Sequence, residues 1–408
     1  MRWSVLFAFS LMPAMAAAQG APASYEAVSG DNYTGKELFF AYDGAYARFR
    51  ARRQDETLAA AFCLDDCERD IIDTPEQGPF VRAELIEDEA ASWITLRFSD
   101  FWLGESSRLI ISGEEGSFQE FTQQKLEAWE GETAAFNGGR LLLELVVAAG
   151  ENPLPSYTID EIAFGRPPVA SPREPGALIE ESADQPQNVC GDDHRVSSSD
   201  DRVARIWKGG CTAWPLANGA FVTAGHCPKA GGMGVLEFRV PISGPDGSAR
   251  HPDQAFQYKI QSGSIVYESS GVGKDWAVFS ILPNDRGETP KDLFGYFDVH
   301  RDYADGELIV RGYGKDDDPL GSETSGFNEQ SQTQQEHGAA YVVKQKGVVI
   351  EHEADTERGS SGSPLLNLDG VAFGIHTHGK CESDVNENKG TGFMNDDFWA
   401  AIQQFGPL

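Results

Sequence analysis

Short apolar stretches rich in β-forming residues recur along the chain and are separated by Gly, Asp, Glu and Ser. Between about residues 24 and 166 they include the segments ELFFAYDG, WITLRFSDFWL, RLIISG and RLLLELVVAA. Such segments, bounded by turn residues, are typical of β-strands, and few stretches show a helical period. The pattern predicts a small β-sandwich over residues 24–166.

A second series of short strands with Gly-rich turns runs from about residue 188 to residue 408. Its last segment differs, because its apolar residues share one helical face: Phe398, Trp399, Ile402 and Phe405. Asn395 or Asp396 can cap the start of this helix, and Gly406 follows its end. The second half is therefore predicted to be mainly β with one C-terminal helix.

The two halves are joined by residues 167–187, which hold five prolines and several acidic residues. This composition is typical of an exposed linker that proteases can cleave. A chain of 408 residues is also too long for one ordinary domain. We therefore expect two domains, at residues 24–166 and 188–408.

The N-terminus has the pattern of a signal peptide over residues 1–18. Arg2 gives a positive start, an apolar run follows from Val5 to Met12, and Ala16-Ala17-Ala18 offers a cleavage site. The run is too short to span a bilayer, and no later segment approaches about 18 unbroken apolar residues. The sequence predicts a secreted protein, extracellular or periplasmic, with no membrane anchor.

The chain is strongly acidic, since 33 Lys and Arg against 64 Asp and Glu give a formal net charge of -31 at pH 7. Such a surface repels nucleic acid and anionic lipid, so neither is an expected partner. It also resists self-association, so a soluble monomer without a cofactor is expected. Attraction of basic substrates is the alternative interpretation of the charge.

The six cysteines, in a chain expected to be exported, predict disulfides. The expected pairs are Cys63–Cys67, Cys211–Cys227 and Cys190–Cys381. The first two close locally, and the third would tie the start of the second half to a loop near its end. The cysteines are scattered and lack paired CxxC spacing, so no metal site is expected.

A candidate general base stands at the end of the segment CTAWPLANGAFVTAGHC. The apolar strand Ala220–Val222 leads to His226, and a disulfide at Cys227 would lock the loop that holds the imidazole. A serine hydroxyl is a poor nucleophile at neutral pH and needs such a base to take its proton.

A candidate carboxylate to orient that base lies in GKDWAVFSI, residues 273–281. Asp275 sits just before the apolar strand Ala277–Ile281, where a carboxylate can reach a histidine of a neighbouring element. Asp before an apolar strand is a common pattern, so this assignment depends on the other two segments.

A candidate nucleophile, Ser361, lies between glycines in GSSGSP. Gly359 and Gly362 permit the tight turn that a nucleophile loop needs. The backbone N–H groups of Gly359 and Ser361 can then form an oxyanion hole. An apolar strand and Pro364 follow at once, which argues against a Ser/Gly linker.

These three segments, in the order His, Asp, Ser, resemble the trypsin-like serine endopeptidase superfamily and, within it, the bacterial glutamyl endopeptidases. NVCGDDHRV (188–196) is similar to the N-terminal segment of that group, and VRGYG (310–314) to the strand that opens the second barrel. The resemblance covers about residues 188–408. It implies two six-stranded antiparallel β-barrels with the catalytic triad in the cleft between them.

The resemblance implies a serine endopeptidase that cleaves proteins or peptides through an acyl-enzyme. The alternative is a non-catalytic adhesion or recognition protein that keeps the protease scaffold. One departure from the family is informative: vertebrate-type trypsins carry an acid just before the nucleophile, and here that residue is Ser360. An activation switch that pairs such an acid with a new N-terminus is therefore not expected.

The residues that the resemblance places at the substrate pocket are Asp355, Thr356, His376 and Thr377. His376 has the spacing of the pocket histidine of glutamyl endopeptidases and can donate to a substrate carboxylate, helped by Thr356. Asp355 stands where trypsins hold the acid that binds Lys or Arg, and it would repel Glu. Thr377 aligns with the residue whose backbone pairs with the substrate. Glu/Asp preference is favoured, with Lys/Arg preference as the alternative.

Two further features are left open by the sequence. Asp316-Asp317-Asp318 could bind calcium, although a solvated acidic turn is the preferred interpretation. The first domain could be a propeptide, a carbohydrate- or surface-binding module, or a spacer, and the cleavable linker favours a propeptide.

Overall fold

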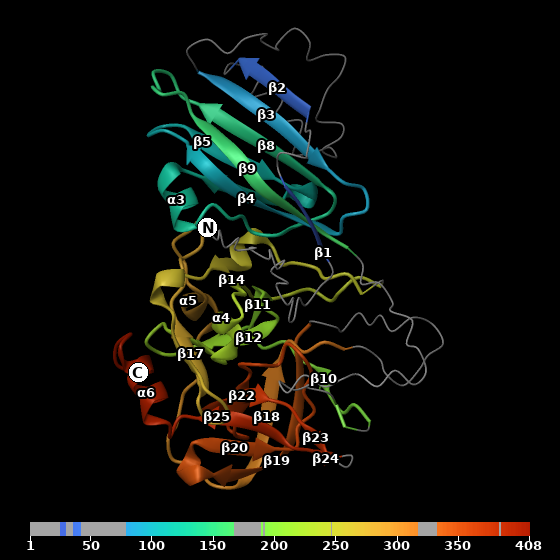
Figure 1. Ribbon diagram of the computed structural model, residues 1–408, viewed down its shortest axis with the longest axis vertical. Coiled ribbons are helices and arrows are strands. Elements are labelled where there is room, and N and C mark those ends of the chain that lie inside the picture. The colour runs from blue at the N-terminus through green and yellow to red at the C-terminus, as the bar shows by residue number, and fades with distance from the viewer. Residues whose placement is uncertain are drawn as a thin grey trace, which may run out of the picture.

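The computed structural model describes residues 79–166, 189–190, 192–245, 247–316, 333–382 and 385–408, with the backbone of strands at 25–29 and 36–41. Three β-structures follow one another along the long axis of the molecule (Figure 1). A sandwich lies at one end, a curled sheet in the middle and a closed barrel at the other end. The expected mainly β fold is confirmed, with four α-helices in the described part.

The first domain consists of two antiparallel sheets, with orders β1-β9-β4-β7 and β2-β3-β8-β5-β6. The strands of the first sheet are β1 (Tyr25–Ser29), β4 (Trp93–Trp102), β7 (Phe136–Asn137) and β9 (Ser156–Gly165). Those of the second are β2 (Lys36–Ala41), β3 (Phe80–Glu87), β5 (Arg108–Ser112), β6 (Phe118–Phe121) and β8 (Arg140–Val147). Aromatic and aliphatic side chains of both sheets form one buried cluster, as expected for a sandwich.

One short helix of this domain, α3 (Gln123–Ala128), was not predicted. The Thr122 side chain caps it by accepting from the Lys125 N–H at 3.3 Å. Only Leu126 of the helix is buried, so its six residues show too little apolar periodicity to indicate a helix. The 3₁₀ turn η2 (Glu114–Gly116) precedes β6.

The middle sheet has the order β15-β14-β11-β12-β13-β17-β16. Its strands are β11 (Ala204–Lys208), β12 (Cys211–Pro215), β13 (Phe221–Thr223), β14 (Met233–Glu237), β15 (Gln257–Lys259), β16 (Val266–Ser269) and β17 (Asp275–Phe279). An isolated bridge between Ile260 and Ile281 joins β15 to the end of β17. The sheet therefore curls back on itself and makes an open first barrel.

The second barrel is closed. Its sheet has the order β10-β19-β18-β21-β22-β25-β20, and β20 pairs again with β19, so six strands form a ring. The strands are β10 (Val196–Ser197), β18 (Gly306–Gly312), β19 (Gln335–Lys344), β20 (Val349–His352), β21 (Pro364–Leu366), β22 (Ala372–His378) and β25 (Asn388–Gly392). A small ribbon of β23 (Cys381–Glu382) and β24 (Val385–Asn386) projects from it.

The expected C-terminal helix is α6 (Asp396–Gln403), and it ends before Phe405. The Asn395 side chain caps it by accepting from the Phe398 N–H at 2.9 Å. Phe398 stacks on Trp276 of β17 with ring centroids 5.3 Å apart. The helix that follows the second barrel thus packs on the first, beside Asp275.

The remaining helices are short. They are α4 (His226–Lys229), α5 (Pro290–Phe294), η3 (Gln254–Phe256), η4 (Ser262–Ser264) and η5 (Gln345–Gly347). A search of the described part finds no helix with the length and apolar character needed to cross a membrane.

Both disulfides expected in the second half are present, Cys190–Cys381 and Cys211–Cys227. The expected signal peptide (1–18), the Cys63–Cys67 pair and the linker (167–187) lie outside the described residues. Of the acidic run, Asp316 is described, and Asp317 and Asp318 are not.

Candidate active site

His226 is held in place by the short path from β13 into α4. The strand ends at Thr223, and His226 is the first residue of the helix. A Cβ on Gly225 would lie 1.8 Å from the Glu268 carbonyl oxygen, so only glycine lets this loop approach β16 so closely. The Cys211–Cys227 disulfide ties the next residue to β12. The imidazole is thereby fixed between strands of the first barrel.

Asp275, the first residue of β17, is buried and faces His226. One carboxylate oxygen accepts from the His226 backbone N–H at 2.7 Å, and the other lies 2.7 Å from His226 Nδ1. An ionised carboxylate only accepts hydrogen bonds, so Nδ1 carries the proton and Nε2 is left as the basic nitrogen. The structure therefore brings these two predicted residues into direct contact.

Ser361 lies in the turn between β20 and β21. The following Gly362 has φ +89°, and a Cβ there would lie 2.1 Å from the Thr212 carbonyl oxygen. The Thr212 N–H donates to the Ser361 carbonyl at 2.8 Å, and the Thr212 hydroxyl donates to the Gly359 carbonyl at 2.9 Å. The loop that carries Ser361 is thus hydrogen-bonded to β12 of the first barrel. His226 belongs to the same barrel.

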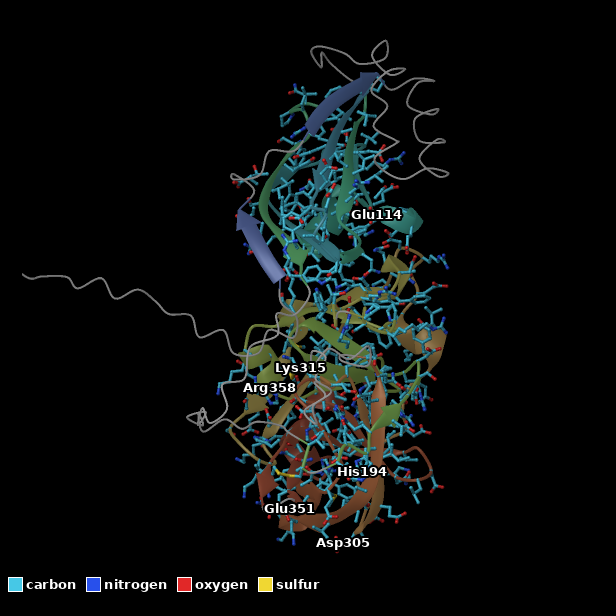
Figure 2. All side chains as sticks on the ribbon, turned by 90° about the vertical axis from the view of Figure 1, so that its right-hand side faces the viewer. Glu114, His194, Asp305, Lys315, Glu351 and Arg358 are labelled. Atoms are coloured by element: carbon cyan, nitrogen blue, oxygen red, sulfur yellow. A yellow bond between two sulfur atoms is a disulfide. The ribbon has the colours of Figure 1, made fainter. Side chains whose placement is uncertain are left out.

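The two N–H groups of the predicted oxyanion hole belong to peptide groups whose carbonyl oxygens each accept a hydrogen bond from another part of the backbone. The Arg358 carbonyl, in the plane of the Gly359 N–H, accepts from the Lys315 N–H at 2.8 Å, and Figure 2 labels these two neighbours. The Ser360 carbonyl, in the plane of the Ser361 N–H, accepts from the Ser363 N–H at 3.0 Å. A trans peptide points its N–H away from its C=O, so both orientations are set before any substrate binds.

Ser360 has a local role. Its N–H donates to the Glu357 carbonyl at 2.9 Å, and its hydroxyl accepts from the Glu357 N–H at 3.4 Å. These bonds close the turn before the nucleophile without a carboxylate at residue 360.

His376 is fully buried in β22 and is joined to a second histidine that the sequence analysis missed. His376 Nδ1 lies 3.1 Å from Nε2 of His352, the last residue of β20. Burial lowers the pKa of His352 to about 3, and burial lowers the pKa of His376 well below its usual value, with the neighbouring histidines acting in the same direction. Both rings are therefore neutral at neutral pH.

Two polar atoms at the predicted pocket have no hydrogen-bond partner among the described residues. They are His376 Nε2 and the hydroxyl of Thr356, which is only 1% exposed. The backbone of His376 is bonded to the nucleophile loop, since its carbonyl accepts from the Gly362 N–H at 2.7 Å and its N–H donates to the Ser363 carbonyl at 2.9 Å. Buried polar groups normally have partners, so two unpaired buried atoms at this position are unusual.

Thr377 and Asp355 use their side chains within the protein. The Thr377 hydroxyl donates to the Lys389 carbonyl at 3.1 Å. The Asp355 carboxylate accepts from the His194 N–H at 2.8 Å and from Asn386 Nδ2 at 2.5 Å. The His194 and His337 rings also flank it, with Nδ1 atoms 3.1 and 3.3 Å from Oδ2. Asp355 thus anchors the segment that begins the second half.

Two groups of potential metal ligands occur in the described part of the chain. Cys211, His226 and Cys227 form one, but the two sulfur atoms are bonded to each other. His194, His337 and Asp355 form the other. His337 Nδ1 already accepts the Asp355 N–H at 2.7 Å, and Asp355 already accepts several hydrogen bonds. The disulfide accounts for the first group and hydrogen bonding for the second, and we assign no metal to either.

Comparisons with known proteins place this site in a family. A family model described as Trypsin matches residues 189–394. A search of curated protein sequences finds no match. A solved Glu endopeptidase in complex with MPD is 20% identical, covers 53% of this chain and 98% of its own, and has a TM-score of 0.40.

Two other solved structures are similar over about the same share of the chain. The thermostable serine protease AL20 from an extremophilic microorganism is 16% identical, with coverages of 50% and 95% and a TM-score of 0.37. Protease Anisep from Arthrobacter nicotinovorans is 12% identical, with coverages of 49% and 93% and a TM-score of 0.36. Because the family match spans just over half of the 408 residues, the chain belongs to the trypsin family and is a serine endopeptidase.

Proposed function

We propose that this endopeptidase is exported and cleaves proteins or peptides after Glu or Asp, with Ser361 as nucleophile, His226 as general base and Asp275 as its orienter. The pair of 2.7 Å contacts between Asp275 and His226 carries the assignment of the base. The buried His352–His376 pair carries the assignment of the substrate.

The proposed reaction gives each of these groups one role. His226 Nε2 takes the proton of the Ser361 hydroxyl while its oxygen attacks the scissile carbonyl. Asp275 is already bonded to Nδ1–H and stabilises the imidazolium that forms. The N–H groups of Gly359 and Ser361 donate hydrogen bonds to the developing oxyanion. His226 then returns the proton to the leaving amine, and water hydrolyses the acyl-enzyme by the same route.

The proposed preference for an acidic residue depends on which ring nitrogens of the histidine pair carry protons. The two neutral rings share one proton between His352 Nε2 and His376 Nδ1. If His352 donates, His376 Nε2 carries the second proton and faces outward from the pair as a donor. A substrate carboxylate at Nε2 selects this tautomer, and the unpaired Thr356 hydroxyl can donate to the same carboxylate. A Lys or Arg side chain offers only donors, so it would need the opposite tautomer, in which His376 Nε2 accepts, and the Thr356 hydroxyl as an acceptor.

Asp355 gives little support to the alternative, a preference for Lys or Arg. Its side chain is 2% exposed, and both carboxylate oxygens accept hydrogen bonds from the protein. A basic substrate would have to displace Asn386 or the His194 backbone to reach this charge. The carboxylate is better explained as an internal acceptor.

The proposal of export is supported by the two disulfides, Cys190–Cys381 and Cys211–Cys227. Such bonds persist in oxidising compartments and are rare in the reducing cytosol.

Cleavage profiling on a mixed peptide library, with Ser361→Ala as control, tests the proposal. We expect cuts after Glu and Asp, labelling of Ser361 by a fluorophosphonate probe, and neither in the folded Ser361→Ala protein. Cuts after Lys or Arg would overturn the proposed preference. Labelling of another residue, absence of labelling, or full activity in Ser361→Ala would overturn the proposed triad.

A further inference from the structure

The N-terminal sandwich and the first barrel share one hydrophobic cluster. Trp93 of β4 packs edge-on against Trp207 of β11 with ring centroids 5.0 Å apart. Val235 of β14 and Ala249 belong to the same cluster as the sandwich core. All four side chains are at most 9% exposed, so this surface of the barrel is closed off from water by the sandwich.

Across the contact, two side-chain amides each bond to both the backbone N–H and the backbone carbonyl of one residue in the other domain. Asn137 of the sandwich accepts from the His251 N–H at 2.9 Å and donates to the His251 carbonyl at 2.7 Å. Gln257 of the barrel does the same to Ala135, accepting from its N–H at 2.8 Å and donating to its carbonyl at 2.8 Å. Each pair satisfies a donor and an acceptor that would otherwise be buried without partners. This geometry fixes one orientation of the two domains.

The charges across the contact are also matched. Lys259 of β15 is buried and lies 3.0 Å from Glu130 and 2.8 Å from Glu132 of the sandwich. Lys208 lies 3.8 Å from Glu132. Burial would raise the pKa of Glu132, but the charges of Lys208 and Lys259 hold it below its usual value. A buried lysine needs such partners, and here the other domain supplies them.

A buried ion network lies directly beneath the contact. Glu237 of β14 is bonded to Arg205 at 2.7 Å and to His251 Nδ1 at 2.6 Å, and all three side chains are at most 3% exposed. Burial alone would raise the pKa of Glu237. The charges and hydrogen bonds of His251 and Arg205 outweigh burial and hold this pKa below its usual value, so Glu237 is ionised. Trp93 of the sandwich packs on the His251 ring at 5.3 Å and so helps exclude water from this network.

The position of the contact separates it from the active site. The sandwich meets β11, β14, β15 and the segment before β15, at the end of the first barrel opposite the second barrel (Figure 1). Among the described contacts across this interface, none involves His226, Asp275 or Ser361. The hydrophobic cluster shared by the two barrels contains no described residue of the sandwich.

We propose that the sandwich is a permanently docked subunit of the protease, which stays bound to the first barrel after the chain is cut in 167–187 and does not inhibit the active site. The interface combines an apolar centre, paired amides and neutralised lysines, the features of a stable interface. A blocking propeptide would instead cover the catalytic groups.

The test uses the full chain with a recognition sequence for an unrelated site-specific protease inserted within 167–187. After the cut, size-exclusion chromatography with light scattering at low micromolar concentration is expected to show one species containing both pieces. Activity on a general protein substrate is expected to change by less than about twofold. Separate elution of the pieces, or a rise in activity of about tenfold or more, would overturn the proposal. The mass readout does not depend on the substrate preference, so failure of the Glu/Asp assignment is distinguishable.

Paired variants sharpen the result. Glu132→Lys places a positive charge beside Lys208 and Lys259 and is expected to weaken association of the cut pieces by at least about tenfold. Glu105→Lys makes the same charge change at an exposed site of the same domain and is expected to leave association unchanged. Equal behaviour of the two variants would refute the role given to the lysines.

Discussion

His226 and His376 are both held through Nδ1, but their partners differ in kind. His226 Nδ1 faces a carboxylate, Asp275, at 2.7 Å, and its ring is 38% exposed. His376 Nδ1 faces another imidazole, His352, at 3.1 Å, and its ring is fully buried. A carboxylate favours the protonated ring, whereas a neutral imidazole in a buried site opposes it.

On the proposed assignments, one residue type serves two tasks in one enzyme. A general base has to accept a proton during the reaction, so it needs a negative partner and access to the substrate. A recognition group has to present a fixed N–H, so a neutral partner and burial suit it. The partner of Nδ1 therefore distinguishes the proposed catalytic histidine from the proposed recognition histidine.

The strongest test of this comparison makes the partner of His226 neutral. Asp275→Asn is expected to lower kcat by about 10⁴-fold, because the amide no longer fixes the Nδ1–H tautomer or stabilises the imidazolium. Steady-state kinetics on a Glu-containing peptide measure the effect, with thermal unfolding as a control for folding. A loss of less than about tenfold would mean that Asp275 does not orient the base.

Removing the recognition histidine should have a smaller and selective effect. His376→Ala is expected to lower kcat/KM about 10- to 150-fold for peptides cleaved after Glu, since a hydrogen bond to a charged group contributes about 1.5–3 kcal/mol. Peptides with Gln at the same position should change much less. An equal loss on both peptides would indicate a structural role for His376 and contradict the proposed pocket.

The neutral partner of His376 should appear in the pH dependence of stability. The pKa of His352 is about 3 when folded and near 6.5 when unfolded, so the unfolded chain binds more protons between these values. The free energy of unfolding should therefore fall as the pH drops below about 6.5, by up to about 1.4 kcal/mol per pH unit from this group.

His352→Gln keeps an N–H donor but does not titrate, so its acid loss should be about 2–3 kcal/mol smaller at pH 4.5. Urea unfolding at pH 7 and pH 4.5 measures this difference. His300→Gln, at an exposed site, serves as the matched control for the change from His to Gln. An unchanged slope in His352→Gln would argue against a buried neutral pair.

The loops that carry the proposed base and nucleophile could be predicted because contiguous residues encode them. TAGHC and GSSGSP specify tight loops by their glycines, and the Cys211–Cys227 bond closes locally. His352 could not be found this way. Its strand, β20, does not pair with β22, which carries His376, and the two strands are brought close because both pair with β25.

The contact between the sandwich and the first barrel could not be predicted from the sequence for a similar reason. A proline-rich linker indicates separable domains, and only the folded surfaces bring Trp93 onto Trp207 and Glu132 onto Lys259. Contacts that depend on long-range pairing leave no local pattern in the sequence.

The smallest expected effect on specificity belongs to Asp355, the acid that conflicted with His376 in the sequence. Asp355→Asn should change the ratio of cleavage after Glu to cleavage after Lys by less than about threefold. It should lower the free energy of unfolding by about 1–3 kcal/mol, because an amide cannot accept from both Asn386 and the His194 N–H. Asp305→Asn is the matched control, since a single acceptor for the Val343 N–H at 2.6 Å is retained. A tenfold shift in the ratio would show that the Asp355 charge reaches the substrate, and the contrast between a carboxylate-held base and a neutral recognition pocket would then fail.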